Sequence, residues 1–156
     1  MAIRRRAAGF SLIELLVVMA VLGILAMATL PLAEVTQRRE RERELKRALW
    51  EIRDAIDAYK RAADAGQIAK IGNGYPPTLA TLSEGVPDAT ASGQRRYFLR
   101  KIPHDPFAPD GQTASQSWGL RSYASSPDRP EPGADVFDVF SQSDRIGLDG
   151  MALRQW

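Results

Sequence analysis

The chain of 156 residues contains no cysteine and only one histidine, His104. Without cysteine there are no disulfides, no thiolate metal ligands and no cysteine nucleophile. Pro103 and Pro106 flank His104 and favour a structural or solvated histidine over a general base. The sequence also lacks a glycine-rich phosphate loop and a serine in a nucleophile elbow. These absences predict a protein that is not an enzyme.

The chain also lacks a marked excess of one charge. Its formal net charge of +2 arises from 21 basic and 19 acidic side chains, and three of the basic ones are Arg4, Arg5 and Arg6. Without residues 1–9, 18 basic side chains face 19 acidic ones. No basic surface remains in excess to attract phosphates, so we predict no nucleic-acid partner.

One long apolar run, residues 15–33, contains no charged residue. Its length approaches the ~20 residues that a helix needs to cross the hydrocarbon core of a membrane. The arginines before the run predict a cytoplasmic amino terminus, with the rest of the chain on the far side. Glu14 directly precedes the run, and a carboxylate there costs about 2.5 to 3.5 kcal/mol if it reaches the bilayer centre. A secretory signal peptide cleaved near Ala26 to Ala28 is the alternative, but it gives Glu14 no role.

A short motif surrounds that carboxylate. Gly9 is followed by Phe10, and Glu14 is the fifth residue counted from Phe10. The motif resembles the class III signal of type IV pilins and type II secretion pseudopilins. The resemblance implies that a membrane peptidase cuts between Gly9 and Phe10 and methylates the new amino terminus of Phe10. Pro31 stands where this family commonly has a helix-kinking proline. Physically, the Glu14 carboxylate can neutralise the freed Phe10 amine of a neighbouring copy, which makes assembly favourable for both groups.

From residue 34 to residue 65 the pattern becomes amphipathic. Residues 37–44 are almost wholly charged and predict either a solvated stretch or ion pairs between subunits. Further on, apolar residues recur at alternating steps of four and three, which predicts one buried helical stripe made of Leu45, Leu49, Ile52, Ile56, Tyr59 and Ala63. This stripe is predicted to be flanked by Trp50, Ala48, Ala55 and Ala62. Gly66 is expected to end the helix.

The remaining residues predict a small domain rich in loops. Thr78 is expected to cap a short helix that ends at Glu84, and residues 88–94 to form a mobile surface loop. Two strands are predicted at 118–124 and 136–141, which form an antiparallel sheet packed on the helical stripe. The expected fold is therefore α+β and pilin-like: a long amino-terminal helix with a protruding apolar half, packed on a small antiparallel sheet, with a loop-rich carboxyl-terminal region.

Three later segments resemble, more narrowly, the G-type major pseudopilins: 75–76, 101–107 and 137–141. In that family the carboxyl-terminal loop commonly binds calcium through backbone carbonyls and a closely spaced pair of aspartates. This chain has no adjacent pair there, and the candidate ligands are Asp144 and Asp149. Calcium takes six to eight oxygen ligands, so they would need further donors. Arg145 could replace the ion by pairing with a carboxylate, and solvated turn aspartates are the other alternative.

The resemblance implies a division of the chain into four parts. They are a leader removed by prepilin peptidase (1–9), a transmembrane and filament-core helix (10–33), its amphipathic continuation (34–65) and a periplasmic head (66–156). It further implies a structural subunit of a type II secretion pseudopilus. Such a subunit is anchored in the inner membrane, self-assembles with other pseudopilins on the secretion platform, and promotes export across the outer membrane. The alternatives are a type IV pilus subunit, major or minor, and an exported periplasmic domain that binds a ligand.

Overall fold

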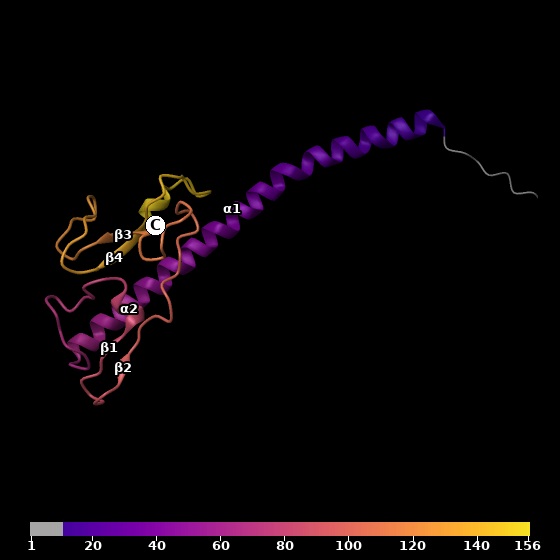
Figure 1. Ribbon diagram of the computed structural model, residues 1–156. Coiled ribbons are helices and arrows are strands. Elements are labelled where there is room, and N and C mark those ends of the chain that lie inside the picture. The colour runs from indigo at the N-terminus through magenta and orange to yellow at the C-terminus, as the bar shows by residue number, and fades with distance from the viewer. Residues whose placement is uncertain (1–10) are drawn as a thin grey trace, which may run out of the picture. The chain divides into compact units, whose positions relative to one another are not determined.

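The computed structural model describes residues 11–156, except for the side chains of residues 27–33. The chain divides into two compact units, Met1–Arg39 and Glu40–Trp156. Helix α1 (Leu12–Asp64) contributes its first part to one unit and its second part to the other (Figure 1). The predictions for Gly9 and Phe10 lie outside the described residues.

In the amino-terminal unit, α1 begins after Ser11, whose hydroxyl oxygen accepts a hydrogen bond from the Glu14 backbone N–H at 3.4 Å. The large apolar side chains between Leu12 and Leu25 are all exposed, by 48 to 77%. The helix continues through position 31, while the kink expected at Pro31 stays a prediction. Over the residues that the structure describes, no helix is both long enough and apolar enough to span a membrane.

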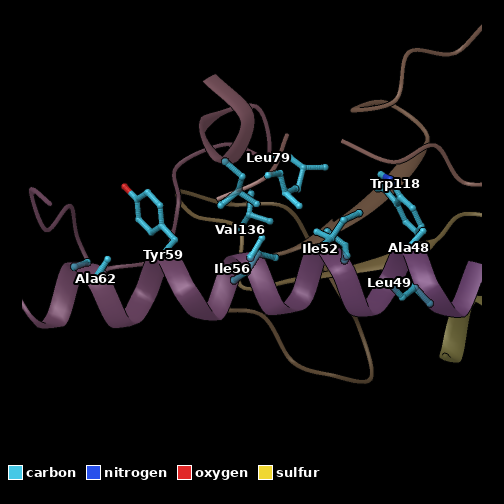
Figure 2. Close-up of a cluster of buried hydrophobic side chains, with 14 of the residues drawn as sticks. Ala48, Leu49, Ile52, Ile56, Tyr59, Ala62, Leu79, Trp118 and Val136 are labelled. Atoms are coloured by element: carbon cyan, nitrogen blue, oxygen red, sulfur yellow. The ribbon is translucent and has the colours of Figure 1, made fainter. Parts of the chain in front are cut away.

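The carboxyl-terminal unit is built on the predicted helical stripe. All six of its residues are at most 3% exposed, so this prediction is confirmed: Leu45, Leu49, Ile52, Ile56, Tyr59 and Ala63. Figure 2 shows the stripe facing Leu79, Trp118 and Val136, which arrive from three later segments. Trp50, placed at the flank of the stripe, is instead 68% exposed. At 3.6 residues per turn, its position lies roughly 140° from the centre of the stripe.

The ends of the helices follow local rules. Helix α1 ends at Asp64, and Gly66 adopts the left-handed φ of 68° that was expected of a helix-ending glycine. Helix α2 (Thr81–Glu84) begins later than expected. The Thr78 hydroxyl oxygen accepts a hydrogen bond from the Thr81 N–H at 3.3 Å, so Thr78 still supports the start of this helix.

The predicted antiparallel sheet is present, with shorter strands than expected. β3 (Trp118–Arg121) pairs with β4 (Asp138–Ser141), with Trp118 opposite Ser141. Phe137 N–H still donates to the Arg121 carbonyl, and beyond it the two chains separate: Ser122 N–H donates to the Glu131 carbonyl, and Val136 N–H to the Pro76 carbonyl. A 3-10 turn, η1 (Leu153–Gln155), follows and places Leu153 in the core. The α+β, pilin-like fold class is confirmed.

The predicted loop 88–94 is the turn of a hairpin that the sequence did not reveal. Its strands, β1 (Val86–Pro87) and β2 (Arg95–Arg96), pair antiparallel. Asp88 closes the turn: its carboxylate accepts hydrogen bonds from the Thr90 N–H and hydroxyl, at 2.8 and 2.6 Å, and from Arg96 Nη2 at 2.8 Å. Bonds from Thr90 and then Arg96 lower the pKa of Asp88 from 3.8 to about 2.

Asp88 therefore predicts a pH dependence. Because its pKa is lower in the folded chain, its contribution to stability is present above pH 4 and is lost as the pH falls toward about 2. At pH 7 we expect Asp88→Asn to unfold at a lower denaturant concentration than the wild type. At about pH 2 the unfolding midpoints of the two proteins should nearly coincide. Asp110→Asn, at an exposed loop position, is the matched control. Equal midpoints for wild type and Asp88→Asn at pH 7 would contradict this role.

Candidate functional site

The first candidate site is the apolar surface of α1 in the amino-terminal unit. A helix that is apolar on all sides is normally buried in a protein or a membrane. Here those side chains are exposed on every face, and the Glu14 carboxylate stands exposed at the start of the surface. Among the described residues, no cation lies within ion-pair distance of Glu14. Within the described residues, the segment therefore has neither a cover for its apolar atoms nor a partner for its charge.

The second candidate region is where the three segments of the G-type resemblance meet. The Tyr75 ring packs edge-on against the Phe137 ring, with centroids 5.0 Å apart. Asp105, from the proline-rich connection, accepts a 2.6 Å hydrogen bond from the Ser141 hydroxyl. Segments 75–76 and 101–107 are thus each joined to segment 137–141, one at each of its ends.

The Asp105 carboxylate is the centre of this junction. It is 1% exposed, and its other oxygen accepts a 2.7 Å bond from the Phe107 N–H. Its own N–H donates to the Ser117 hydroxyl oxygen at 3.1 Å. The Trp118 indole N–H donates to the Pro103 carbonyl at 2.8 Å, which fixes the start of the same segment. The connection is extended and ordered, as its prolines predicted.

The third candidate is the predicted calcium site, and its two aspartates pair with cationic side chains. Asp144 accepts a 3.0 Å hydrogen bond from Arg154, and an oxygen of Asp149 lies 3.7 Å from Lys46 Nζ. Arg145, expected to replace the ion, lies instead with its guanidinium carbon 5.9 Å from the Phe107 ring centroid. The residue that pairs with the loop carboxylate is therefore Arg154 and not Arg145.

Backbone groups of this loop are also used within the chain. Gly147 N–H donates to the Met151 carbonyl at 2.7 Å, and Leu153 N–H to the Arg145 carbonyl at 2.9 Å. The Leu148 N–H donates to the carboxylate of Glu42 on α1 at 3.0 Å. Glu42 was missed in the sequence, although it lies one turn before Leu45 on the edge of the buried stripe. The position of Glu42 in the helical repeat, beside the buried stripe, is the feature of the sequence that could have indicated it.

Calcium binding is not supported by this arrangement. In the part of the chain that the structure describes, no three His, Cys, Asp or Glu side chains come together in a group that could hold a metal ion. The Asp144 carboxylate pairs with Arg154 and the Asp149 carboxylate with Lys46. The carbonyls of Arg145 and Met151 in the loop accept hydrogen bonds from backbone N–H groups. The pairing of both aspartates with cations favours the ion-paired alternative, and calcium binding stays a prediction that rests on the family resemblance.

We therefore expect calcium to have no effect on stability. Thermal unfolding of the full chain in detergent should give the same midpoint in millimolar calcium chloride and in chelator, because a ligand stabilises only a folded state that binds it. Magnesium chloride at the same ionic strength is the control for salt screening. A midpoint that rises by several degrees in calcium alone would contradict the expectation.

The only histidine and the side chains of one surface hollow make hydrogen bonds and ion pairs within the chain. Both ring nitrogens of His104 face backbone carbonyl oxygens, of Asp105 at 2.8 Å and of Gln112 at 3.2 Å. A hollow of about 930 Å³ is lined in part by Arg53 and Asp138. These two side chains form a 2.8 Å ion pair, and Arg53 also donates to the Val139 carbonyl at 3.1 Å.

Comparisons with known proteins agree with the resemblance seen in the motifs. Residues 4–30 match the family model described as the prokaryotic N-terminal methylation motif. The chain is 27% identical to the type II secretion system core protein G of Aeromonas hydrophila over 154 residues, which cover 96% of this chain and 88% of the relative. It is 29% identical to the protein of the same name from Pseudomonas aeruginosa over 152 residues, 94% and 87% of the two chains. No solved structure matches. The predicted similarity to type IV pilins and pseudopilins, and to the G type among them, is confirmed.

Proposed function

We infer that this chain is a type II secretion pseudopilin of the G type. It is a structural, non-enzymatic subunit that assembles through its amino-terminal helix into a periplasmic filament and promotes protein export across the outer membrane. The observation that carries this inference is the similarity of nearly the whole chain to two proteins named type II secretion system core protein G. The methylation motif at residues 4–30 is the feature such a subunit requires for its maturation.

Processing follows from the same inference. Prepilin peptidase removes residues 1–9 by cutting between Gly9 and Phe10, and it methylates the amino group of Phe10. Residues 10–33 then remain as the anchor in the inner membrane, with the amino terminus in the cytoplasm and residues 66–156 in the periplasm. The exposed apolar side chains between Leu12 and Leu25 are covered first by lipid.

Assembly replaces lipid by neighbouring copies. The Glu14 carboxylate approaches the Phe10 amine of the next subunit, and each charge satisfies the other in an apolar setting. Pro31 is placed to adjust the direction of the helix within the filament. The partners are further copies of this chain, other pseudopilins, prepilin peptidase and the inner-membrane secretion platform.

The methylation motif alone is also compatible with a type IV pilus subunit, so the test must separate secretion from surface fibres. The gene is deleted in the bacterium that carries it, and exported proteins in the medium are compared with surface fibres and twitching motility. We expect the exported proteins to accumulate in the periplasm while fibres and motility persist. Loss of fibres with normal export would overturn the assignment to secretion.

A further inference from the structure

Two tyrosine rings are stacked at the surface of the carboxyl-terminal unit. Tyr75 and Tyr123 have ring centroids 5.7 Å apart and planes inclined by 24°. The Phe137 ring meets both of them edge-on, with centroid distances of 5.0 Å to Tyr75 and 5.5 Å to Tyr123. Even with these contacts, Tyr123 is 57% exposed. Because the stack covers one face of its ring, the exposed part includes the face turned away from Tyr75.

Backbone hydrogen bonds hold the exposed ring in place. The Tyr123 N–H donates to the Asp135 carboxylate at 2.8 Å, which closes the neck of the loop between these two residues. The Val136 N–H donates to the Pro76 carbonyl at 2.8 Å and so ties the end of this loop to the segment that carries Tyr75. A ligand that packs on a side chain fixed in this way has less conformational entropy to remove on binding.

Polar groups with spare hydrogen-bonding capacity border the stack. The exposed Asn73 lies two residues before Tyr75, and its Nδ2 is 3.5 Å from an oxygen of Asp135. Within the described chain, the Asn73 amide oxygen accepts no hydrogen bond, and the hydroxyls of Tyr75 and Tyr123 make none. Asp135 pairs with no described cation. A flat aromatic face is thus bordered by amide, carboxylate and hydroxyl groups.

We propose that this tyrosine platform, made of Asn73, Tyr75, Tyr123 and Asp135, binds the glycan strands of the cell wall, which are β-1,4-linked chains of N-acetylated amino sugars. The proposal rests on the periplasmic location inferred above. A sugar ring presents C–H bonds on its flat faces and hydroxyl and acetamido groups around its edge. The C–H bonds pack on the electron-rich face of an aromatic ring, and the edge groups pair with amide and carboxylate oxygens. The platform carries both kinds of group side by side.

The charges around the tyrosine platform favour an uncharged ligand. Lys60 Nζ lies 5.5 Å from the Tyr75 ring centroid. The Arg121 guanidinium carbon lies 4.6 Å from the Phe137 centroid. The described cations near the rings are each paired with a carboxylate of the chain: Lys60 and Lys70 with Asp64, and Arg121 with Asp138. A phospholipid headgroup or an acidic peptide would therefore meet the Asp135 carboxylate without a free cation, which disfavours both against a neutral sugar chain.

Binding to purified cell-wall sacculi tests the proposal. The full-length chain in detergent is mixed with sacculi, and the fraction that sediments with them is measured. We expect the wild type to bind and Tyr123→Ala to weaken binding about fivefold, because the stacking surface is lost. Tyr123→Phe keeps the ring and should retain most of the binding. Tyr97→Ala removes a tyrosine that is 61% exposed outside the platform, and as the matched control it should bind as wild type does.

Two treatments identify the part of the cell wall that is bound. Sacculi from which an amidase has removed the stem peptides should bind the chain as before. A soluble chito-oligosaccharide, which is a β-1,4-linked chain of N-acetylglucosamine, should displace the chain from the sacculi. Loss of binding after amidase treatment would show that the stem peptides are the ligand and overturn the proposal. Equal sedimentation of wild type and Tyr123→Ala would overturn it as well.

The outcomes separate this proposal from the secretion function. Thermal unfolding in detergent shows whether Tyr123→Ala is folded; if it is not, Asn73→Ala at an exposed loop position takes its place, with about a threefold weakening expected from one lost hydrogen-bonding group. If sacculi retain no wild-type chain while deletion of the gene blocks export, the glycan proposal fails and the secretion function stands. If sacculi retain the chain through Tyr123 while deletion leaves export unchanged, the platform stands and the secretion function fails.

Discussion

Replacing Glu14 with alanine is expected to leave membrane insertion intact and to reduce filament assembly at least tenfold. Removal of the carboxylate makes insertion easier, because a charged side chain in hydrocarbon costs about 2.5 to 3.5 kcal/mol. Assembly suffers because the Phe10 amine of the neighbouring copy is left without its counter-charge. Membrane fractionation measures the first effect, and recovery of sedimentable filaments measures the second.

Two further variants define the cause. Glu14→Gln keeps the size of the side chain and removes its charge, so it should fail in assembly as the alanine variant does. Glu34→Ala removes an exposed carboxylate beyond the apolar run and should assemble normally. If Glu14→Ala and Glu14→Gln enter filaments as wild type does, pairing between Glu14 and Phe10 has no part in assembly.

Asp105→Ala is expected to lower the free energy of unfolding by about 3 kcal/mol. The substitution removes the acceptor for the Ser141 hydroxyl, which stays buried, and for the Phe107 N–H, which is partly buried. Unsatisfied buried donors cost about 1 to 3 kcal/mol each. Denaturant unfolding of the full chain in detergent measures the loss.

Smaller substitutions separate the two hydrogen bonds. Ser141→Ala removes one donor and leaves the Asp105 carboxylate bound to Phe107, so a loss of about 1 kcal/mol is expected. Asp105→Asn keeps the shape of the side chain and one acceptor oxygen, and should fall between the two. If Asp105→Ala unfolds at the wild-type denaturant concentration, the junction does not depend on this carboxylate.

Helical periodicity predicted the core because the buried face of a helix repeats along the sequence. Leu45 and Ile56 are buried for this reason. Trp50 is apolar, but its position in the helical repeat places it on the outer face of α1, so its hydrophobicity alone does not predict its burial. The helical repeat also places Glu42 beside the buried stripe, where its carboxylate accepts a hydrogen bond from the Leu148 N–H.

Features that depend on spatial neighbours could not be predicted in this way. The β1–β2 hairpin has two-residue strands, one containing Pro87, and these are too short to show an alternating pattern. Arg145 is next to Asp144 in the sequence, but Arg154 pairs with it because the η1 segment folds back against the loop. The Asp105–Ser141 bond joins residues 36 positions apart, and no local signal indicates such a contact.

Mass spectrometry of the mature amino terminus tests the central claim most directly. The chain is purified from the membrane of its own bacterium, and its first residue and the modification of that residue are determined. The pseudopilin assignment predicts Phe10 as the first residue, with a methylated amino group. A mature chain that begins at Thr29 would show conventional export and contradict the account.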